Sequence, residues 1–165
     1  MIDTAFHLLF GKGENVEEPR FTHEQIRHQA QEDALAYLLA SVVYFKEQRR
    51  SPQEFIAAVG EALVPLWKKL KNHEVPVVMD ALALHMVSLG ARLVATEGND
   101  DLAFATFAQV PSFDLLKIFG LSRDEADAIW DIFKPIATFL NLEYSWSRQQ
   151  DEVTLKLSRP GLSQA

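Results

Sequence analysis

The stretch from Ala34 to Phe45 reads Ala-Leu-Ala-Tyr-Leu-Leu-Ala-Ser-Val-Val-Tyr-Phe, an apolar run interrupted only by Ser41. A helix that is apolar all round is typical of one enclosed by other elements. We expect a helix from 23 to 48 around this stretch, because Thr22 and Gln25 have the spacing of a capping box. The run therefore predicts a buried central helix.

A second apolar stretch runs from Val77 to Ala95 and predicts a second core helix, with shorter amphipathic helices packed around the two. Capping residues, prolines and glycines mark the other boundaries, and Pro65 should bend or break the helix that contains it. Beyond the first helix, we expect helices over 52–71, 76–96, 101–109, 113–119 and 123–140.

The C-terminal part of the chain has a different pattern. Between 142 and 158, apolar and polar side chains alternate on both sides of a polar loop, as in Leu142-Glu143-Tyr144 and Val153-Thr154-Leu155. Period-two alternation predicts an antiparallel hairpin with one buried face.

These elements predict a mainly α, single-domain helical bundle of five to seven helices with a C-terminal antiparallel β-hairpin. The 165 residues suffice for one domain with its own core. Within that domain we expect a mobile N-terminal segment over 1–20, a helical core over 21–140, the hairpin over 141–158 and a frayed tail over 159–165.

Composition excludes several classes of function. The chain has no cysteine, which excludes disulfides and thiolate chemistry and favours the cytoplasm. The N-terminal residues lack the pattern of a signal peptide, and no apolar run reaches the ~18 residues of a membrane span, so we expect no membrane partner. A net charge of −7 repels polyanions, so nucleic acid is not an expected partner.

One polar stripe interrupts the second apolar stretch. Asp80, His85, Ser88 and Arg92 would share one arc of about 140° on a helix over 76–96. Such a stripe is either an exposed or internally hydrogen-bonded strip, or a site where His85 and Arg92 bind a ligand or take part in a reaction. The four residues are the candidate ligand site.

A second set lies near the start of the first helix. Glu24, His28 and Glu32 stand four residues apart and could hold a divalent ion with one further ligand from elsewhere. The alternative is a solvated helix face, because Ile26 and Tyr37, together with Ala30, are expected on the buried arc opposite this column.

Residues 112–158 resemble a winged helix-turn-helix. A short helix from Phe113 to Phe119, the turn Gly120-Leu121-Ser122, a longer helix and a hairpin follow in the order of that family. The resemblance implies DNA binding, with Arg148 in the wing loop and Arg123 as phosphate contacts. The longer helix is acidic, however, and would repel DNA, so the resemblance implies a winged helix used for packing or partner contact.

Taken together, the sequence predicts a regulatory protein that binds a protein partner or a small molecule non-covalently. A winged-helix transcriptional regulator and an enzyme or ligand carrier around His85 are the alternatives. No catalytic residue or cofactor is predicted, so we do not expect an enzyme. A homodimer is a further expectation, with Tyr44, Phe45, Trp67 and Trp146 as candidate interface residues.

Overall fold

The structure is a computed structural model, and it describes residues 22–108 and 110–161. The predicted mobile segment 1–20 and the last four residues of the predicted frayed tail lie outside the described residues. The elements follow in the order α2 (His23–Glu47), α3 (Pro52–Leu63), the 3-10 helix η1 (Val64–Leu70), α4 (Val75–Ser88), β1 (Arg92–Asn99), β2 (Leu102–Ala108), α5 (Phe113–Phe119), α6 (Arg123–Ala126), the 3-10 helix η2 (Asp127–Ile132), α7 (Phe133–Phe139), β3 (Glu143–Gln149) and β4 (Glu152–Ser158).

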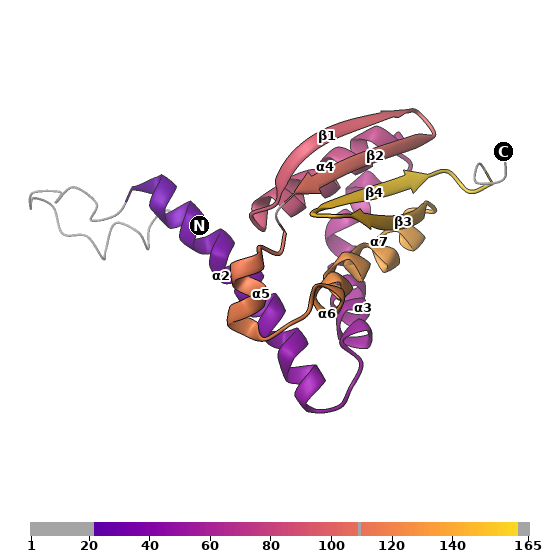
Figure 1. Cartoon of the computed structure of the whole chain (residues 1–165). Helices are drawn as coiled ribbons and strands as arrows, with labels where there is room; N and C mark the ends of the chain where they lie inside the picture. Colours follow the sequence, from indigo (N-terminus) through magenta and orange to yellow (C-terminus); the bar gives the residue numbers. More distant parts are fainter. Residues whose placement is uncertain (1–21, 109, 162–165) are drawn as a thin grey trace, which may run out of the picture.

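The four strands form one antiparallel sheet in the order β1-β2-β4-β3 (Figure 1). The predicted helical bundle is therefore wrong, because residues 92–99 and 102–108 form a hairpin where two helices were expected. The predicted C-terminal hairpin is confirmed, but it is one half of the sheet and not an appendage. Its strand β4 pairs with β2 across the middle, from Leu102–Ser158 to Ala108–Glu152.

One face of the sheet carries the core. The inward side chains of the two central strands are fully buried: Ala103, Ala105, Phe107, Val153, Leu155 and Leu157. Helix α4 crosses behind β1 and β2, and α7 lies against β3 (Figure 1). The alternate positions of β2, such as Phe104 and Thr106, face away from these helices and are partly exposed. The molecule is thus a helical layer on a sheet with one open face.

The predicted helix over 76–96 is confirmed as far as Ser88, but the residues after Ser88 are not helical. Gly90 ends it with φ +88°, a left-handed conformation that side-chain-bearing residues rarely adopt. The amide of Ala91 then donates to the carbonyl of Met86 at 3.0 Å, which closes the last turn. The chain enters β1 directly, so the apolar residues after Gly90 belong to a strand.

Two prolines divide the other long helices. Pro65 cannot donate to the carbonyl of Glu61, and the chain changes to the 3-10 helix η1 at Val64, so the predicted break is confirmed. The helix expected over 123–140 is wrong as a single element. It consists of α6, η2 and α7, and Pro135 in α7 likewise cannot donate to Asp131.

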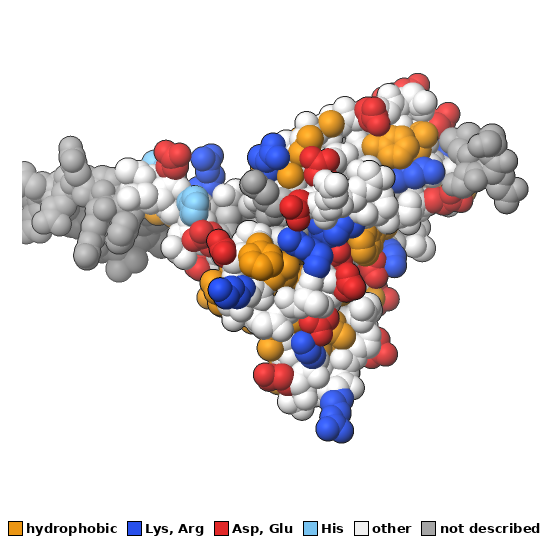
Figure 2. Space-filling model, in the orientation of Figure 1, with side chains coloured by type: hydrophobic (Ala, Val, Ile, Leu, Met, Phe, Trp, Pro, Cys, Tyr) orange, Lys and Arg blue, Asp and Glu red, His pale blue; other side chains and the backbone are white. Residues whose placement is uncertain are grey.

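Helix α2 begins as predicted, with a capping box between Thr22 and Gln25, but it is not enclosed. Only one side is buried, at Leu35, Leu39 and Val42. The buried arc expected at Ile26, Ala30 and Tyr37 is therefore wrong: these residues are exposed, and the Glu24–Glu32 column lies nearer the buried side. Residues 22–30 are all exposed, and this half of α2 projects from the body (Figures 1 and 2).

Among the described residues, none of the helices combines the length and the apolar character needed to cross a membrane.

Candidate functional site

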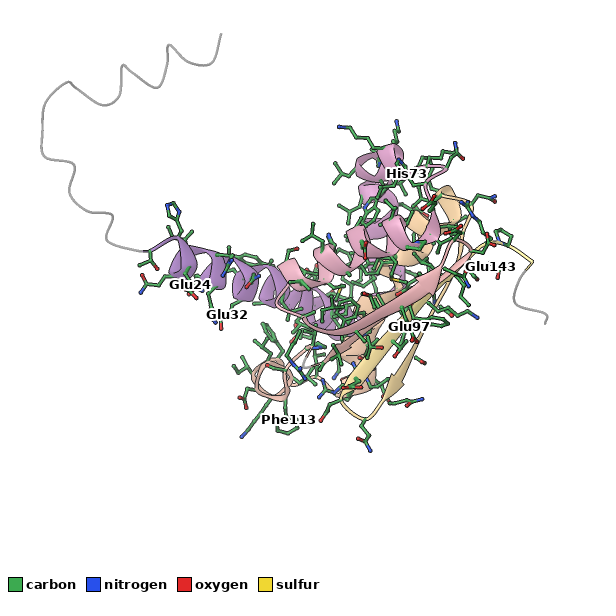
Figure 3. The ribbon with its side chains drawn as sticks, turned by 90° about the horizontal axis from the view of Figure 1, so that it is seen from above. Glu24, Glu32, His73, Glu97, Phe113 and Glu143 are labelled. Carbon is green, nitrogen blue, oxygen red and sulfur yellow. The ribbon has the colours of Figure 1, made fainter. Side chains whose placement is uncertain are left out.

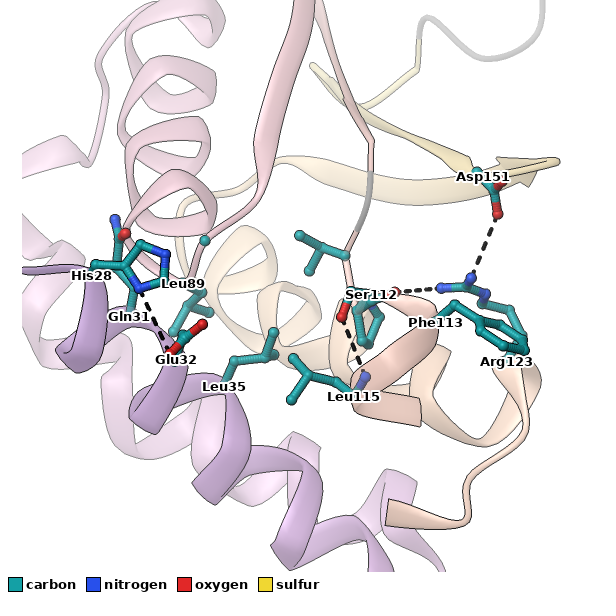
Figure 4. Close-up of a pocket in the computed structure, with 13 residues that line it drawn as sticks. His28, Gln31, Glu32, Leu35, Leu89, Ser112, Phe113, Leu115, Arg123 and Asp151 are labelled. Carbon is teal, nitrogen blue, oxygen red and sulfur yellow. Dashed lines mark hydrogen bonds and ion pairs between the residues drawn. The ribbon is translucent and has the colours of Figure 1, made fainter. Parts of the chain in front are cut away.

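A groove of about 620 Å³ lies between α2, the end of α4, α5 and the β3–β4 turn (Figure 4). We call it the α2–α5 groove. It is lined by side chains from all four regions: His28, Gln31, Glu32, Leu35, Leu89, Gly90, Val110, Pro111, Ser112, Phe113, Leu115, Arg123 and Asp151.

The floor of the groove is apolar. Leu35 of α2 and Leu115 of α5 point toward each other across it (Figure 4), and Val110 and Pro111 are buried beside them. Phe113 stands at the edge with 71% of its surface exposed. An exposed phenylalanine next to an apolar floor offers a large contact area to anything that enters.

Local hydrogen bonds hold the walls in place. The side-chain Nε2 of Gln31 donates to the backbone carbonyl of Val87 at 3.2 Å and ties α2 to the end of α4. Ser112 caps α5, because its hydroxyl accepts from the amide of Leu115 at 3.3 Å. The α2 wall is therefore tied to the end of α4, and the start of α5 is held by its own cap.

Charged side chains form the two rims. On α2, Nδ1 of His28 lies 3.6 Å from a carboxylate oxygen of Glu32. On the opposite rim the guanidinium of Arg123 donates to the carbonyl of Pro111 and lies 3.5 Å from a carboxylate oxygen of Asp151. Each rim thus presents one basic and one acidic group, and the groove has no strong net charge.

The other predicted phosphate contact, Arg148, is not at the surface. Its guanidinium is nearly buried against the carboxylate of Asp127, with Nε donating to Oδ2 at 2.6 Å. It also donates to the carbonyl of Val110 at 3.5 Å, behind the groove floor. Arg148 therefore stabilises the floor, and Arg123 alone of the two reaches a surface.

The predicted metal column is only partly brought together. His28 and Glu32 form the rim pair just described, and Glu24 lies one turn earlier on the projecting part of α2 (Figure 3). Within the described ranges, no group of three or more His, Cys, Asp or Glu side chains could hold a metal ion.

The predicted polar stripe is divided between two elements, because Asp80, His85 and Ser88 lie on α4 and Arg92 lies on β1. Arg92 begins β1 and is no longer on the helix, Asp80 is exposed, and the hydroxyl of Ser88 donates to the carbonyl of His85 at 2.6 Å. His85 is half-buried, with its ring 5.6 Å from Phe133 and 6.4 Å from Trp67, centroid to centroid. Burial lowers the pKa of His85 below 6.5 and favours the neutral ring.

His28, Glu32 and Arg123 of the groove were predictable from sequence as candidate site residues, whereas the apolar part of the groove was not. Leu35, Phe113 and Leu115 resemble ordinary core residues at helical spacing, and only the folded chain shows that Phe113 is uncovered.

A comparison with protein-family models finds no match to this chain, and a comparison with curated proteins finds no similar sequence.

Proposed function

We propose that this protein acts by non-covalent binding of a protein partner, which places a short apolar segment in the α2–α5 groove. The observation that carries the proposal is Phe113, a large apolar side chain left exposed at the edge of a groove with an apolar floor. Uncovered apolar surface of this kind is typical of sites that bind other proteins.

The charges around the groove support a peptide-like occupant. The two rims each combine a basic and an acidic side chain, His28 with Glu32 and Arg123 with Asp151. In a bound peptide, an apolar anchor residue contributes most of the binding energy, and the polar groups on either side of it contact the rim. Rims that carry both a basic and an acidic side chain can orient those polar groups. We propose that this binding is regulatory and takes place in the cytoplasm.

A library of short random peptides displayed on phage provides the test. Peptides selected on the wild-type protein are measured by fluorescence polarisation against Phe113→Ala and Ile118→Ala. Both side chains lie on α5 and are equally exposed, at 71% and 74%, but only Phe113 lines the groove. We expect Phe113→Ala to weaken binding at least fivefold, as for an anchor residue, and Ile118→Ala to leave it unchanged.

Equal loss in both variants would contradict the proposal, because it would place the peptide on the outer surface of α5. Selection of no peptide at all, or of peptides insensitive to Phe113→Ala, would also contradict it. Circular dichroism of each variant checks that the helices are intact.

A further inference from the structure

The face of α2 opposite the groove carries an uncovered apolar stripe. Ile26, Tyr37 and Tyr44 are each more than half exposed, and at 100° per residue they fall within 20° of one another around the helix. Alanines and a serine fill the space between and beside them: Ala30, Ala34, Ala40 and Ser41. The buried residue Leu35 lies on the other side, so the stripe and the groove use opposite faces of one helix.

We propose that this stripe binds the same stripe of a second copy of the chain, with the two α2 helices antiparallel. The stripe is self-complementary when a twofold axis relates the two copies at residue 35, which is the midpoint between Ile26 and Tyr44. In that arrangement Ile26 of each copy meets Tyr44 of the other, and Ala30 meets Ala40. Large side chains thus meet one another at the two ends, whereas between them Tyr37 faces the smaller side chains of Ala30, Asp33 and Ala34 on the other copy.

The polar residues at the edges of the stripe fit the same register. Asp33 falls opposite Tyr37, whose hydroxyl can donate to the carboxylate, and His23 falls opposite Glu47. The Asp33 carboxylate already accepts from the side-chain Nε2 of Gln29 at 2.8 Å and has further lone pairs for the tyrosine hydroxyl. A parallel arrangement would instead place Asp33 beside Asp33, and like charges would repel.

The helix dipoles also favour an inverted copy, because an antiparallel pair sets the dipoles of the two α2 helices head to tail.

The available area is sufficient for a specific dimer. Ile26 and Tyr44 are separated by roughly 27 Å along the helix at 1.5 Å per residue. Aromatic side chains bury about 150–250 Å² each, so the stripe offers roughly 500 Å² on each copy and about 1,000 Å² in total, the lower limit for a specific interface. The projecting half of α2, residues 22–30, would lie along the body of the other copy.

Sedimentation velocity tests the oligomeric state of the full chain at concentrations up to about 100 µM. We expect a species of twice 18.7 kDa in wild type, and a dimer dissociation constant at least tenfold weaker in Tyr37→Glu. Leu66→Glu is the matched control, because Leu66 on η1 is as exposed as Tyr37, at 75% against 73%, and it should leave the dimer unchanged. A monomer at every concentration, or a dimer indifferent to Tyr37→Glu, would overturn the proposal.

The absence of cysteine allows the orientation to be tested directly. Ala30→Cys and Ala40→Cys are prepared separately, one with a size tag, and oxidised alone and mixed. We expect the mixture to form disulfide-linked pairs containing one of each chain, at least fivefold faster than either variant alone. Faster linkage of Ala30→Cys with itself would indicate parallel helices and overturn the antiparallel arrangement. Neither test involves Phe113 or a bound peptide. A negative result for the dimer would therefore leave the proposed peptide binding in the groove unaffected.

Discussion

Arg148 on β3 and Asp127 on η2 form a nearly buried ion pair in which two guanidinium nitrogens donate to the two carboxylate oxygens. The indole nitrogen of Trp130 donates to the same carboxylate at 3.3 Å. The pair joins the edge strand of the sheet to the helical layer beneath it. Because both partners are removed from water, each depends on the other for its solvation.

We expect Asp127→Ala to lower the free energy of unfolding by about 3–5 kcal/mol, since it leaves the charge of Arg148 buried and uncompensated. Urea denaturation followed by circular dichroism measures the change. The double variant Asp127→Leu with Arg148→Met should regain most of the loss, because an apolar pair needs no charge compensation.

Asp151→Ala is the control for that measurement. Asp151 also faces an arginine, Arg123, but its side chain is 83% exposed and the shortest N–O distance is 3.5 Å. Exposed pairs contribute about 0–1 kcal/mol, so this variant should unfold close to wild type. A similar loss in both variants would show that burial of the Arg148 pair has no special effect.

The C-terminal hairpin was predictable from sequence and the first hairpin was not, for a reason visible in β2. In β4 the inward residues are large and the outward ones polar, whereas in β2 the inward Ala103 and Ala105 alternate with the outward Phe104 and Thr106. Alanine favours helices, and apolar residues on both faces conceal the period of two.

The turn before β2 has the same ambiguity. The side chain of Asn99 accepts from the amides of Asp101 and Leu102, both at 3.1 Å. An asparagine makes this kind of bond at a helix N-cap and also in a tight turn, so Gly98-Asn99-Asp100 predicts both equally well. The outcome is decided by the pairing of β2 with β4, whose paired residues lie 44 or more positions away and are not part of the local sequence.

Helix α2 shows which part of the candidate site could not be predicted from sequence. Its N-terminal boundary was predictable because Thr22 and Gln25 satisfy each other locally. Which face is buried was not predictable, since apolar side chains lie on both faces and either could meet the core. The groove depends on that choice, because it brings Leu35 to α5 and leaves Tyr37 in solvent.

His85 predicts a pH dependence of stability. Burial lowers its pKa below 6.5, so under acidic conditions the unfolded chain binds a proton that the folded chain does not. This contribution to stability is fully present above pH 6.5 and is lost as the pH falls toward the lower pKa of the folded state. We expect wild type to lose more unfolding free energy than His85→Gln over this range, measured by urea denaturation at each pH.

His73→Gln serves as the comparison, because it makes the same substitution at an exposed histidine. If the unfolding free energies of His85→Gln and wild type fell equally between neutral and acidic pH, the burial of His85 would not be the cause of the loss of stability in acid.

We expect the substitution Gly60→Ala in α3 to change stability in the direction opposite to that given by helix propensity. A Cβ at this position would lie 2.3 Å from the carbonyl oxygen of Ile132 in η2, a backbone atom that cannot move aside alone. Propensity alone would make Gly60→Ala stabilising by about 1 kcal/mol. We expect instead a loss of about 1–3 kcal/mol, as for an overpacked core, in the unfolding free energy from urea denaturation.

The reverse substitution at an exposed position of the same helix is the control for Gly60. Ala58→Gly removes a methyl group that contacts solvent, so its loss should not exceed the propensity difference of about 1 kcal/mol. A stabilised Gly60→Ala protein would show that α3 and η2 can separate without cost.

Ser122 and Ser51 both occupy N-cap positions, but only one of them caps with its side chain. The hydroxyl of Ser122 accepts from the amide of Glu125 at 3.3 Å, and the Glu125 carboxylate accepts from the amide of Ser122 at 2.8 Å. The hydroxyl of Ser51 instead bonds to the side chain of Gln53 at 2.9 Å. We therefore expect Ser122→Ala to lower the unfolding free energy by about 1 kcal/mol and Ser51→Ala by less than half of that.

Glu125 strengthens the expectation, because the same carboxylate also lies 2.7 Å from Nζ of Lys46 and so connects α6 to α2. The contact with Lys46 is the main reason that the pKa of Glu125 is lowered, followed by the bond from the amide of Ser122. Thermal unfolding of the two alanine variants side by side measures the difference. Equal losses would mean that the cap at Ser122 is not formed in solution.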